Sequence, residues 1–437
     1  MAKNTAEKQL AEKILHSMYH PNGRGKSHSF MFGKPDCPHW EKRSGTELYY
    51  DQDKLLEASF FLRENGASYL KRIPIRIIES KLTNIVSESY GIWSNETYFK
   101  KFECSYFEFV SEASVLSFAQ TLAHSELFKP DDILVVFPIQ IVSVDNEFNS
   151  EHFHLIQPKS LLSIKQPVDV SQFDVCPEKF PPSVRLSNRF YDFKSWLCIT
   201  APNIESAQKK KAAILGALSL KYKSHLRHQF NMVKLVGGYC SFGKSMSNTI
   251  GKPHTPSIHQ PLTITDNDFP FLNKLNNLFS SDSREEFRKI RALEYFYRAW
   301  FLDESERFPF LFMSLESLYG DGVNASQSIV YGVKESVGTE ISEARLKILI
   351  GLRASIVHGG APEIYDSKKY AQYYKKYKVC PSKDLNILVA ACINKSVFEN
   401  KVFAQSDKYQ ATIDKGRSQG KIPNFHDYNI LNNKGTK

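Results

Sequence analysis

The feature that most constrains this chain is a set of four segments in which apolar residues recur every three or four positions. The segments are residues 284–300, 310–319, 342–357 and 384–397. Such spacing puts the apolar side chains on one face of a helix, and that face has to pack against other helices. Glycines follow the second and third segments, as is common at helix ends. We therefore predict a C-terminal four-helix bundle.

The first half of the chain has a different pattern, in which runs typical of strands alternate with runs typical of helices. We expect helices over residues 5–19, 113–128 and 204–230. Expected strands are residues 48–50, 73–78, 106–110, 133–144, 153–156, 196–200 and 232–236. Residues 158–182 contain five prolines, which exclude long helices and central strands there. The predicted fold class is α+β, with a mixed α/β region followed by the all-α bundle.

These patterns predict four parts. Residues 1–190 are expected to form an α+β domain, and residues 191–282 an α/β connector whose second half, from residue 243, is rich in Ser, Asn, Pro, Gly and Thr. Residues 283–400 are expected to form the helical domain. Residues 401–437 are expected to be a tail.

Composition narrows the partners and the compartment. The 437 residues include 57 Lys and Arg against 47 Asp and Glu, a net charge of +10, which favours a polyanionic partner, nucleic acid first and a membrane surface second. The longest apolar runs, residues 133–139 and 387–393, fall short of the ~18 residues that a membrane span needs. Seven scattered cysteines form no Cys-x-x-Cys pair, which disfavours a disulfide scaffold. A cytoplasmic, multi-domain protein without a membrane anchor is expected.

A candidate catalytic pair lies at the end of the third helical segment, in the sequence Arg353-Ala-Ser-Ile-Val-His358-Gly-Gly. Histidine can act as a base or as an acid near neutral pH. Arginine stays charged, and its planar fork matches phosphate oxygens. Five residues turn a helix by ~500°, so Arg353 and His358 do not share one face.

This motif, with Ala292-Leu293-x-x-Phe296-x-x-Ala299 and Leu315-Glu-Ser-Leu318 before it, resembles the HEPN superfamily, and within it the Apea-like branch. The resemblance covers roughly residues 283–400. It implies a metal-independent endoribonuclease that needs no cofactor, leaves 2′,3′-cyclic phosphate ends and forms a homodimer in which two motifs meet. It also implies a toxin-like effector of antiphage defence, with the N-terminal region sensing an unknown trigger. Ala354 stands where the family often has a polar residue.

Two further residues are candidates to support the pair. Glu316 either orients His358, pairs with Arg353 or is a surface carboxylate, and Ser355 is a candidate substitute for the polar residue missing at Ala354. The alternative to catalysis is a non-catalytic RNA-binding or dimerisation module. In that case Arg353 pairs with an acidic neighbour and His358 caps the helix end, where a cation is favourable.

A run of lysines and tyrosines follows the motif, over residues 368–378. Lysines neutralise phosphates, and tyrosine rings can stack on unpaired bases. The predicted RNA contacts are Lys368, Lys369, Tyr373, Tyr374, Lys375, Lys376 and Lys378. The competing interpretation is an ordinary solvated amphipathic helix.

Two other patterns are discounted. Gly238 to Ser245 fits the P-loop pattern, but the residues after it include Gly251 and Pro253, which disfavour the helix that a P-loop requires. A group of His16, His20, His28, Cys37 and His39 matches no standard zinc module, so we expect no metal.

Overall fold

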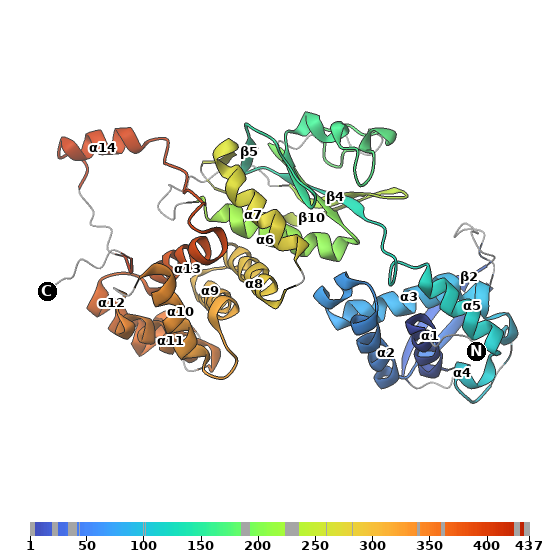
Figure 1. Ribbon diagram of the computed structural model, residues 1–437. Helices are drawn as coiled ribbons and strands as arrows, with labels where there is room; N and C mark the ends of the chain where they lie inside the picture. Colours follow the sequence, from blue (N-terminus) through green and yellow to red (C-terminus); the bar gives the residue numbers. More distant parts are fainter. Residues whose placement is uncertain are drawn as a thin grey trace. The chain divides into compact units, whose positions relative to one another are not determined.

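The computed structural model divides the chain into two compact units, residues 1–132 and 133–437 (Figure 1). The described residues are 5–19, 25–33, 42, 44–98, 100, 102–184, 193–222, 236–258, 260–281, 283–338, 341–359, 363–423 and 429–431. Among them, no helix combines the length and the apolar character that crossing a membrane requires. The two units are described separately below.

The first unit packs helices on a small antiparallel sheet with strand order β1-β3-β2. Its elements are α1 (Ala6–Ser17), β1 (Met18–Tyr19), β2 (Lys26–Phe32), β3 (Ser44–Tyr50), α2 (Gln52–Asn65), α3 (Ile75–Trp93), α4 (Tyr106–Phe109) and α5 (Glu112–Ala123). The predicted helices at 5–19 and 113–128 and the strand at 48–50 are confirmed. The core of this unit is rich in aromatic side chains, with Tyr90, Trp93 and Phe118 at its centre.

Two predicted strands of this unit are wrong. Residues 73–78 lead into helix α3, because Ile78, Leu82 and Val86 repeat every four residues and are buried on one helix face. Residues 106–110 form the short helix α4 instead. In both segments a local alternation of apolar residues suits a strand, but burial in the folded unit follows the helical period.

The second unit begins with a six-stranded antiparallel sheet of order β10-β9-β4-β8-β7-β6. The strands are β4 (Ile133–Ile139), β6 (Phe148–Asn149), β7 (Phe153–Ile156), β8 (Ser195–Ala201), β9 (Gly237–Phe242) and β10 (Met246–Pro253). A separate parallel pair joins β5 (Val142–Val144) to β11 (Leu262–Ile264). The strands predicted at 133–144, 153–156 and 196–200 are confirmed. The strand predicted at 232–236 lies outside the described residues.

The predicted domain boundary near residue 190 falls inside this sheet. Strands β4 and β7 precede residue 190, and both pair with β8, which follows it. The compact units therefore differ from the predicted division, because sheet hydrogen bonds join segments that composition separates. The predicted connector over 243–282 also contains β10, β11 and a further helix, α7 (Phe269–Ser280).

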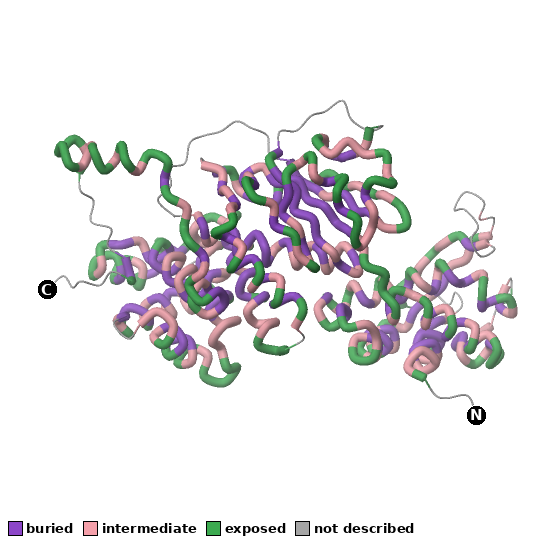
Figure 2. The backbone as a smooth tube through the Cα atoms, turned by 45° about the horizontal axis from the view of Figure 1, so that its top comes forward, coloured by how far each residue is buried: buried purple, intermediate pink, exposed green. Residues whose placement is uncertain are grey.

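Helix α6 (Ile204–Ser219) joins the sheet to the helices that follow. It ends at Ser219, well before the predicted end at residue 230, and residues 223–230 lie outside the described part. A Cβ atom on Gly216 would lie 2.2 Å from the carbonyl oxygen of Leu293, so the two helix backbones are in direct contact there. One apolar core continues from the sheet through α6 into the helices, and in Figure 2 the central strands of the sheet are largely buried, whereas the edge strand β10 is mostly exposed.

The helical part is larger than the four helices predicted. It comprises α8 (Arg284–Ala299), α9 (Glu304–Tyr319), α10 (Ala325–Val337), α11 (Glu343–Val357), α12 (Lys368–Tyr377) and α13 (Pro381–Phe398). The helices predicted at 284–300, 342–357 and 384–397 are confirmed. The second begins earlier than predicted, because the side chain of Asp303 caps it, and Pro309 lies within the helix. With its sheets and helices, the protein has an α+β fold.

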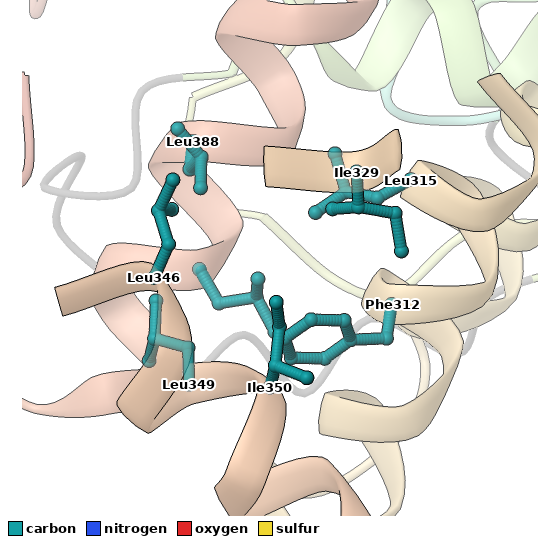
Figure 3. A pocket seen from close by; sticks show the side chains of 8 residues that line it. Phe312, Leu315, Ile329, Leu346, Leu349, Ile350 and Leu388 are labelled. Atoms are coloured by element: carbon teal, nitrogen blue, oxygen red, sulfur yellow. The ribbon is translucent and has the colours of Figure 1, made fainter. Parts of the chain in front are cut away.

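The interior of the helical part is apolar where α9, α10, α11 and α13 meet. A cavity of about 10 Å³ lies there, lined by Phe312, Leu315, Ile329, Leu346, Leu349, Ile350, Leu385 and Leu388 (Figure 3). A void this small and without polar groups does not hold an ordered water. This side of α11 is therefore core, and its chemistry-bearing residues lie elsewhere on the helix.

Described parts of the predicted tail pack on the rest of the second unit. Residues 405–408 lie against residues 260–263 through hydrogen bonds such as Thr263 N to Gln405 Oε1, at 2.8 Å. Helix α14 (Gln410–Ser418) follows and has no buried residue. Residues 429–431 then return to the helical part.

Candidate catalytic site at the end of helix α11

Arg353 lies in the last two turns of α11, on the side that faces α9. Its Nη2 atom is 2.9 Å from Oε1 of Glu316, which lies near the C-terminal end of α9. The two side chains are 31% and 30% exposed, so the pair is half-buried and still open to solvent. Of the three roles predicted for Glu316, the structure has the ion pair with Arg353. The guanidinium is thus held in place while part of it remains accessible.

His358 is the residue at which α11 ends. Its backbone N–H donates to the carbonyl oxygen of Ala354 at 3.0 Å, and Gly359 follows with φ of +74°, which turns the chain away from the helix axis. The His358 side chain is exposed. Among the residues that the structure describes, no group holds its imidazole by a hydrogen bond. The ring is therefore free to meet a ligand or another chain.

Arg353 and His358 lie near the same end of α11 but do not contact one another within the described residues of one chain. The ~500° between them along the helix separates their directions, as the sequence predicted. Arg353 is drawn toward α9 by Glu316. A single chain therefore presents an oriented cation and an unrestrained imidazole as separate groups.

Ser355 lies on the other side of α11, beside α12. Its Oγ donates to the carbonyl oxygen of Gly351 at 3.1 Å, and Lys369 Nζ donates to the same oxygen at 3.1 Å. The structure thus brings together one predicted supporting residue and one predicted RNA contact. Two residues turn a helix by ~200°, so Ser355 points away from Arg353.

Helix α12 carries the lysine and tyrosine run, and it presents most of the predicted contacts outward. Lys368, Lys369, Tyr374, Lys375, Lys376 and Lys378 are exposed. The ring of Tyr374 is 52% exposed, which leaves a face on which a base can stack. Helix α12 is thus a solvated amphipathic helix, as one interpretation of the sequence predicted, and its solvated face is basic.

Tyr373 is a correction to the predicted contacts, because it is fully buried and cannot stack on a nucleic-acid base. It faces the core since residues 370, 373 and 377 share the inner face of α12. Its hydroxyl accepts a hydrogen bond from Arg345 Nε at 2.8 Å and donates to Asp384 Oδ2. Burial raises the pKa of Tyr373, and the carboxylate of Asp384 raises it further.

Sequence reasoning missed the buried network to which Tyr373 belongs. Arg345 of α11 forms an ion pair with Asp384 in the first turn of α13, and both are buried. The guanidinium carbon also lies 4.5 Å from the centre of the Tyr377 ring. The available signal was a charged residue within the apolar part of each helix, at Arg345 and at Asp384.

A second carboxylate holds the two ends of α12. Glu304, in the first turn of α9, accepts a hydrogen bond from Tyr365 just before α12 and one from Cys380 Sγ just after it. The Cys380 contact is 2.5 Å long. Burial raises the pKa of Glu304, but these hydrogen bonds outweigh it and lower the pKa overall. The position of the basic helix is thus set by polar contacts at both of its ends.

A buried basic pair lies away from this site, between α6 and the start of β9. Lys211 Nζ donates to Gln208 Oε1 at 2.6 Å and to His254 Nδ1 at 3.2 Å. Nε2 of His254 donates to the carbonyl oxygen of Gly238, which fixes the tautomer of the neutral ring. Burial lowers the pKa of Lys211 to about 8, and burial with the Lys211 charge lowers that of His254 to about 3.

The P-loop-like segment lies in the second unit, and the N-terminal histidine group lies in the first. The P-loop-like segment forms the hairpin of β9 and β10, and a strand follows Ser245 where a phosphate-binding loop would need a helix. The described residues contain no group of three potential metal ligands. His16 packs on the ring of Phe107 at 4.0 Å, while His20, Cys37 and His39 lie outside the described residues.

Comparisons of the chain with family models, with curated proteins and with solved structures found no match.

Proposed function

We propose that the protein is a metal-independent endoribonuclease of the HEPN type, with Arg353 and His358 as its catalytic residues. One observation carries the proposal: the end of α11 presents both side chains to solvent, with Arg353 oriented by Glu316. Cleavage of a phosphodiester by acid and base requires an oriented, accessible cation and an accessible imidazole, and the end of α11 supplies both as separate groups.

In this reaction the imidazole of His358 takes the proton of a ribose 2′-hydroxyl. The 2′-oxygen attacks the adjacent phosphorus, the bond from phosphorus to the 5′-oxygen breaks, and a 2′,3′-cyclic phosphate forms. An imidazolium returns a proton to the leaving 5′-oxygen. Arg353 stabilises the negative charge that grows on the non-bridging oxygens. The sequence resemblance implies a homodimer in which two motifs meet, and a second copy would supply a second His358, so the proposal includes this dimer.

The substrate is proposed to approach along α12. The exposed lysines of this helix neutralise phosphates, and the ring of Tyr374 offers a stacking surface. Lys369 connects this surface to α11 through the carbonyl of Gly351. A single strand with unpaired bases fits this combination better than a duplex, whose bases are already stacked.

The biological role is proposed on the sequence resemblance, as a toxin-like effector of antiphage defence in the cytoplasm. A nuclease that arrests its own host must be restrained until infection. The first unit and the sheet of the second unit are proposed to sense the trigger, because they account for most of the chain outside the helical part.

A non-catalytic RNA-binding module is the second candidate, and a specific observation favours it. The guanidinium of Arg353 is already engaged by Glu316, and Ala354 offers no polar group beside it. In that case the exposed lysines of α12 account for the function, and His358 serves as a helix cap.

The test is RNA cleavage in EDTA by the wild-type protein, His358→Ala and a matched control. His124→Ala is that control, because His124 is also an exposed histidine at the end of a helix, α5. We expect the wild-type protein and His124→Ala to produce 2′,3′-cyclic phosphate ends and His358→Ala to lose at least ~100-fold in rate. Equal cleavage by all three would contradict the assignment. RNA binding without cleavage in all three would favour the second candidate.

A further inference from the structure

Asp384 is shared by three segments of the chain. Its Oδ2 atom pairs with Arg345 of α11 and accepts the hydroxyl of Tyr373 from α12. Its Oδ1 atom accepts the backbone N–H of Ile430 at 3.0 Å. All four residues are fully or almost fully buried. Ile430 therefore completes the hydrogen bonding of the carboxylate that ties α12 to α11.

Burial changes sharply along the described residues 429–431. Ile430 is fully buried and Asn429 is 8% exposed, whereas Leu431 is 40% exposed. The backbone N–H of Leu431 donates to the side chain of Asn429 at 3.0 Å, which forms a tight turn at the insertion point. Helix α14, upstream on the same segment, has no buried residue. Within the described residues 429–431, Ile430 thus supplies a buried aliphatic side chain and the N–H group that donates to Asp384.

The carboxylate that accepts the Ile430 N–H also accepts the hydroxyl of Tyr373, from the inner face of α12, the helix whose outer face carries the lysines. Tyr373 is the fully buried residue of α12, and its hydroxyl shares Oδ2 of Asp384 with Arg345. Removing the Ile430 N–H would leave one oxygen of a buried carboxylate without this partner and would open the apolar site around it. Both effects weaken the attachment of α12.

We propose that residues 429–431 form a latch that occupies a peptide-binding site at Asp384 and thereby holds α12 against α11. The site takes a turn with one branched aliphatic side chain and a backbone N–H group that donates to the carboxylate, and the chain fills it with its own Ile430. Displacement of this segment releases α12. The consequence for RNA rests on the proposed function, whereas the latch itself does not.

The test uses the full-length protein and hydrogen–deuterium exchange of backbone amides. Ile430→Asp removes the apolar contact and places a carboxylate beside Asp384, and Ile430→Ala is a milder version. Leu431→Asp is the matched control, since its side chain is exposed. We expect amides of residues 368–377 to exchange at least ten-fold faster in Ile430→Asp and unchanged in Leu431→Asp, with β4 and β8 unaffected in both.

A peptide of residues 424–437 should restore slow exchange in α12 when added to Ile430→Asp, and the same peptide carrying the Ile430→Asp change should not. Unchanged exchange in α12 would overturn the latch. So would faster exchange spread evenly over residues 133–437, because Ile430 would then be an ordinary core residue.

RNA binding, measured on the same variants, separates the two proposals. If α12 loosens and RNA affinity falls, both stand. If α12 loosens without an effect on RNA, the latch stands and the role of α12 in RNA binding fails.

Discussion

Helix α11 carries two arginines eight residues apart, and each pairs with a carboxylate on another helix. Arg345 and Asp384 are 3% and 0% exposed, and Tyr373 and Ile430 add further hydrogen bonds to this pair. Arg353 and Glu316 are 31% and 30% exposed, and their ion pair is the one polar contact that the described residues give Arg353. An arginine–carboxylate pair is thus buried at one end of α11, and a second such pair is accessible to solvent at the other end.

The difference separates a structural ion pair from one available for chemistry. A buried charge has lost its hydration and is stabilised only by its partners in the protein. Removing one partner therefore destabilises the fold strongly. A half-exposed pair contributes little to stability, but its cation can still reach a phosphate. Burial and saturation, rather than residue type, thus point to Arg353 as the candidate for catalysis.

The largest effect is expected at the buried pair. Asp384→Ala leaves Arg345 buried without a counter-charge, so the free energy of unfolding should fall by about 3–5 kcal/mol. Urea unfolding of the full-length protein measures it. The double variant Arg345→Met/Asp384→Leu, which removes both charges, should lose less than the single variant. A loss below about 1 kcal/mol in Asp384→Ala would show that this pair is not structural.

The accessible pair should show the reverse behaviour. Arg353→Ala should lower RNA cleavage by about 100-fold, the loss typical of removing one group that stabilises transition-state charge. Its thermal stability should stay close to that of the wild-type protein, because a half-exposed ion pair contributes little. Arg353→Lys keeps the charge but loses the planar fork, and intermediate activity is expected. Full activity in Arg353→Ala would remove this residue from the mechanism.

The buried pair of Lys211 and His254 extends the comparison to a cation, Lys211, whose described hydrogen-bond partners include no carboxylate. The charge of Lys211 and burial together affect the pKa of His254. The pKa of His254 is about 3 in the folded protein and ~6.5 when unfolded, so the unfolded chain binds the proton first as the pH falls. Stability from the neutral ring is complete above pH ~6.5 and is lost progressively toward pH 3, by roughly 2 kcal/mol at pH 5.

His254→Gln should therefore flatten the dependence of thermal unfolding on pH between 7 and 5. His124→Gln, at an exposed site, should leave that dependence as it is in the wild-type protein. An equal pH dependence in wild type and His254→Gln would mean that this histidine does not stay neutral in the folded protein.

The smallest effect is expected at Glu316. Glu316→Gln should change the free energy of unfolding by less than about 1 kcal/mol, because it removes a half-exposed ion pair. Its effect on cleavage should be smaller than that of Arg353→Ala. The guanidinium is still present in Glu316→Gln, and only the carboxylate that orients it is lost. Thermal unfolding and cleavage rates measure the two effects. Cleavage as low as in Arg353→Ala would make Glu316 a participant rather than a positioning residue.

The sequence predicted the helices whose apolar period continues for several turns, such as α8, α11 and α13. It failed at residues 73–78, where the local pattern Ile-Pro-Ile-Arg-Ile-Ile suits a strand and the helical period becomes visible only downstream, at Leu82 and Val86. It also failed at the domain boundary, because pairing of β4 with β8 joins residues about 60 positions apart. Local composition carries no information about such pairing.

Only part of the candidate site could be predicted, because here too local patterns can be read from the sequence and long-range contacts cannot. The motif singled out Arg353 and His358, whose catalytic role stays a prediction, and helical spacing predicted that the two side chains do not share a face. Composition grouped Tyr373 with the exposed lysines, although its place on the inner face of α12 depends on Arg345 and Asp384, which lie 28 and 11 residues away in the sequence. Ile430 had no local signal at all, since its contact is made by a backbone N–H group.

The contact between Gly216 and Leu293 has a consequence for how this protein can be divided in the laboratory. A fragment that begins at residue 283 would lose α6 and uncover the apolar side of α8 that α6 covers, including Ile290 and Leu293. Such a fragment would aggregate rather than report on the helical part by itself. Expression of residues 133–437 as one piece keeps this surface covered. This fragment is smaller than the full-length chain and is therefore a suitable starting point for crystallisation.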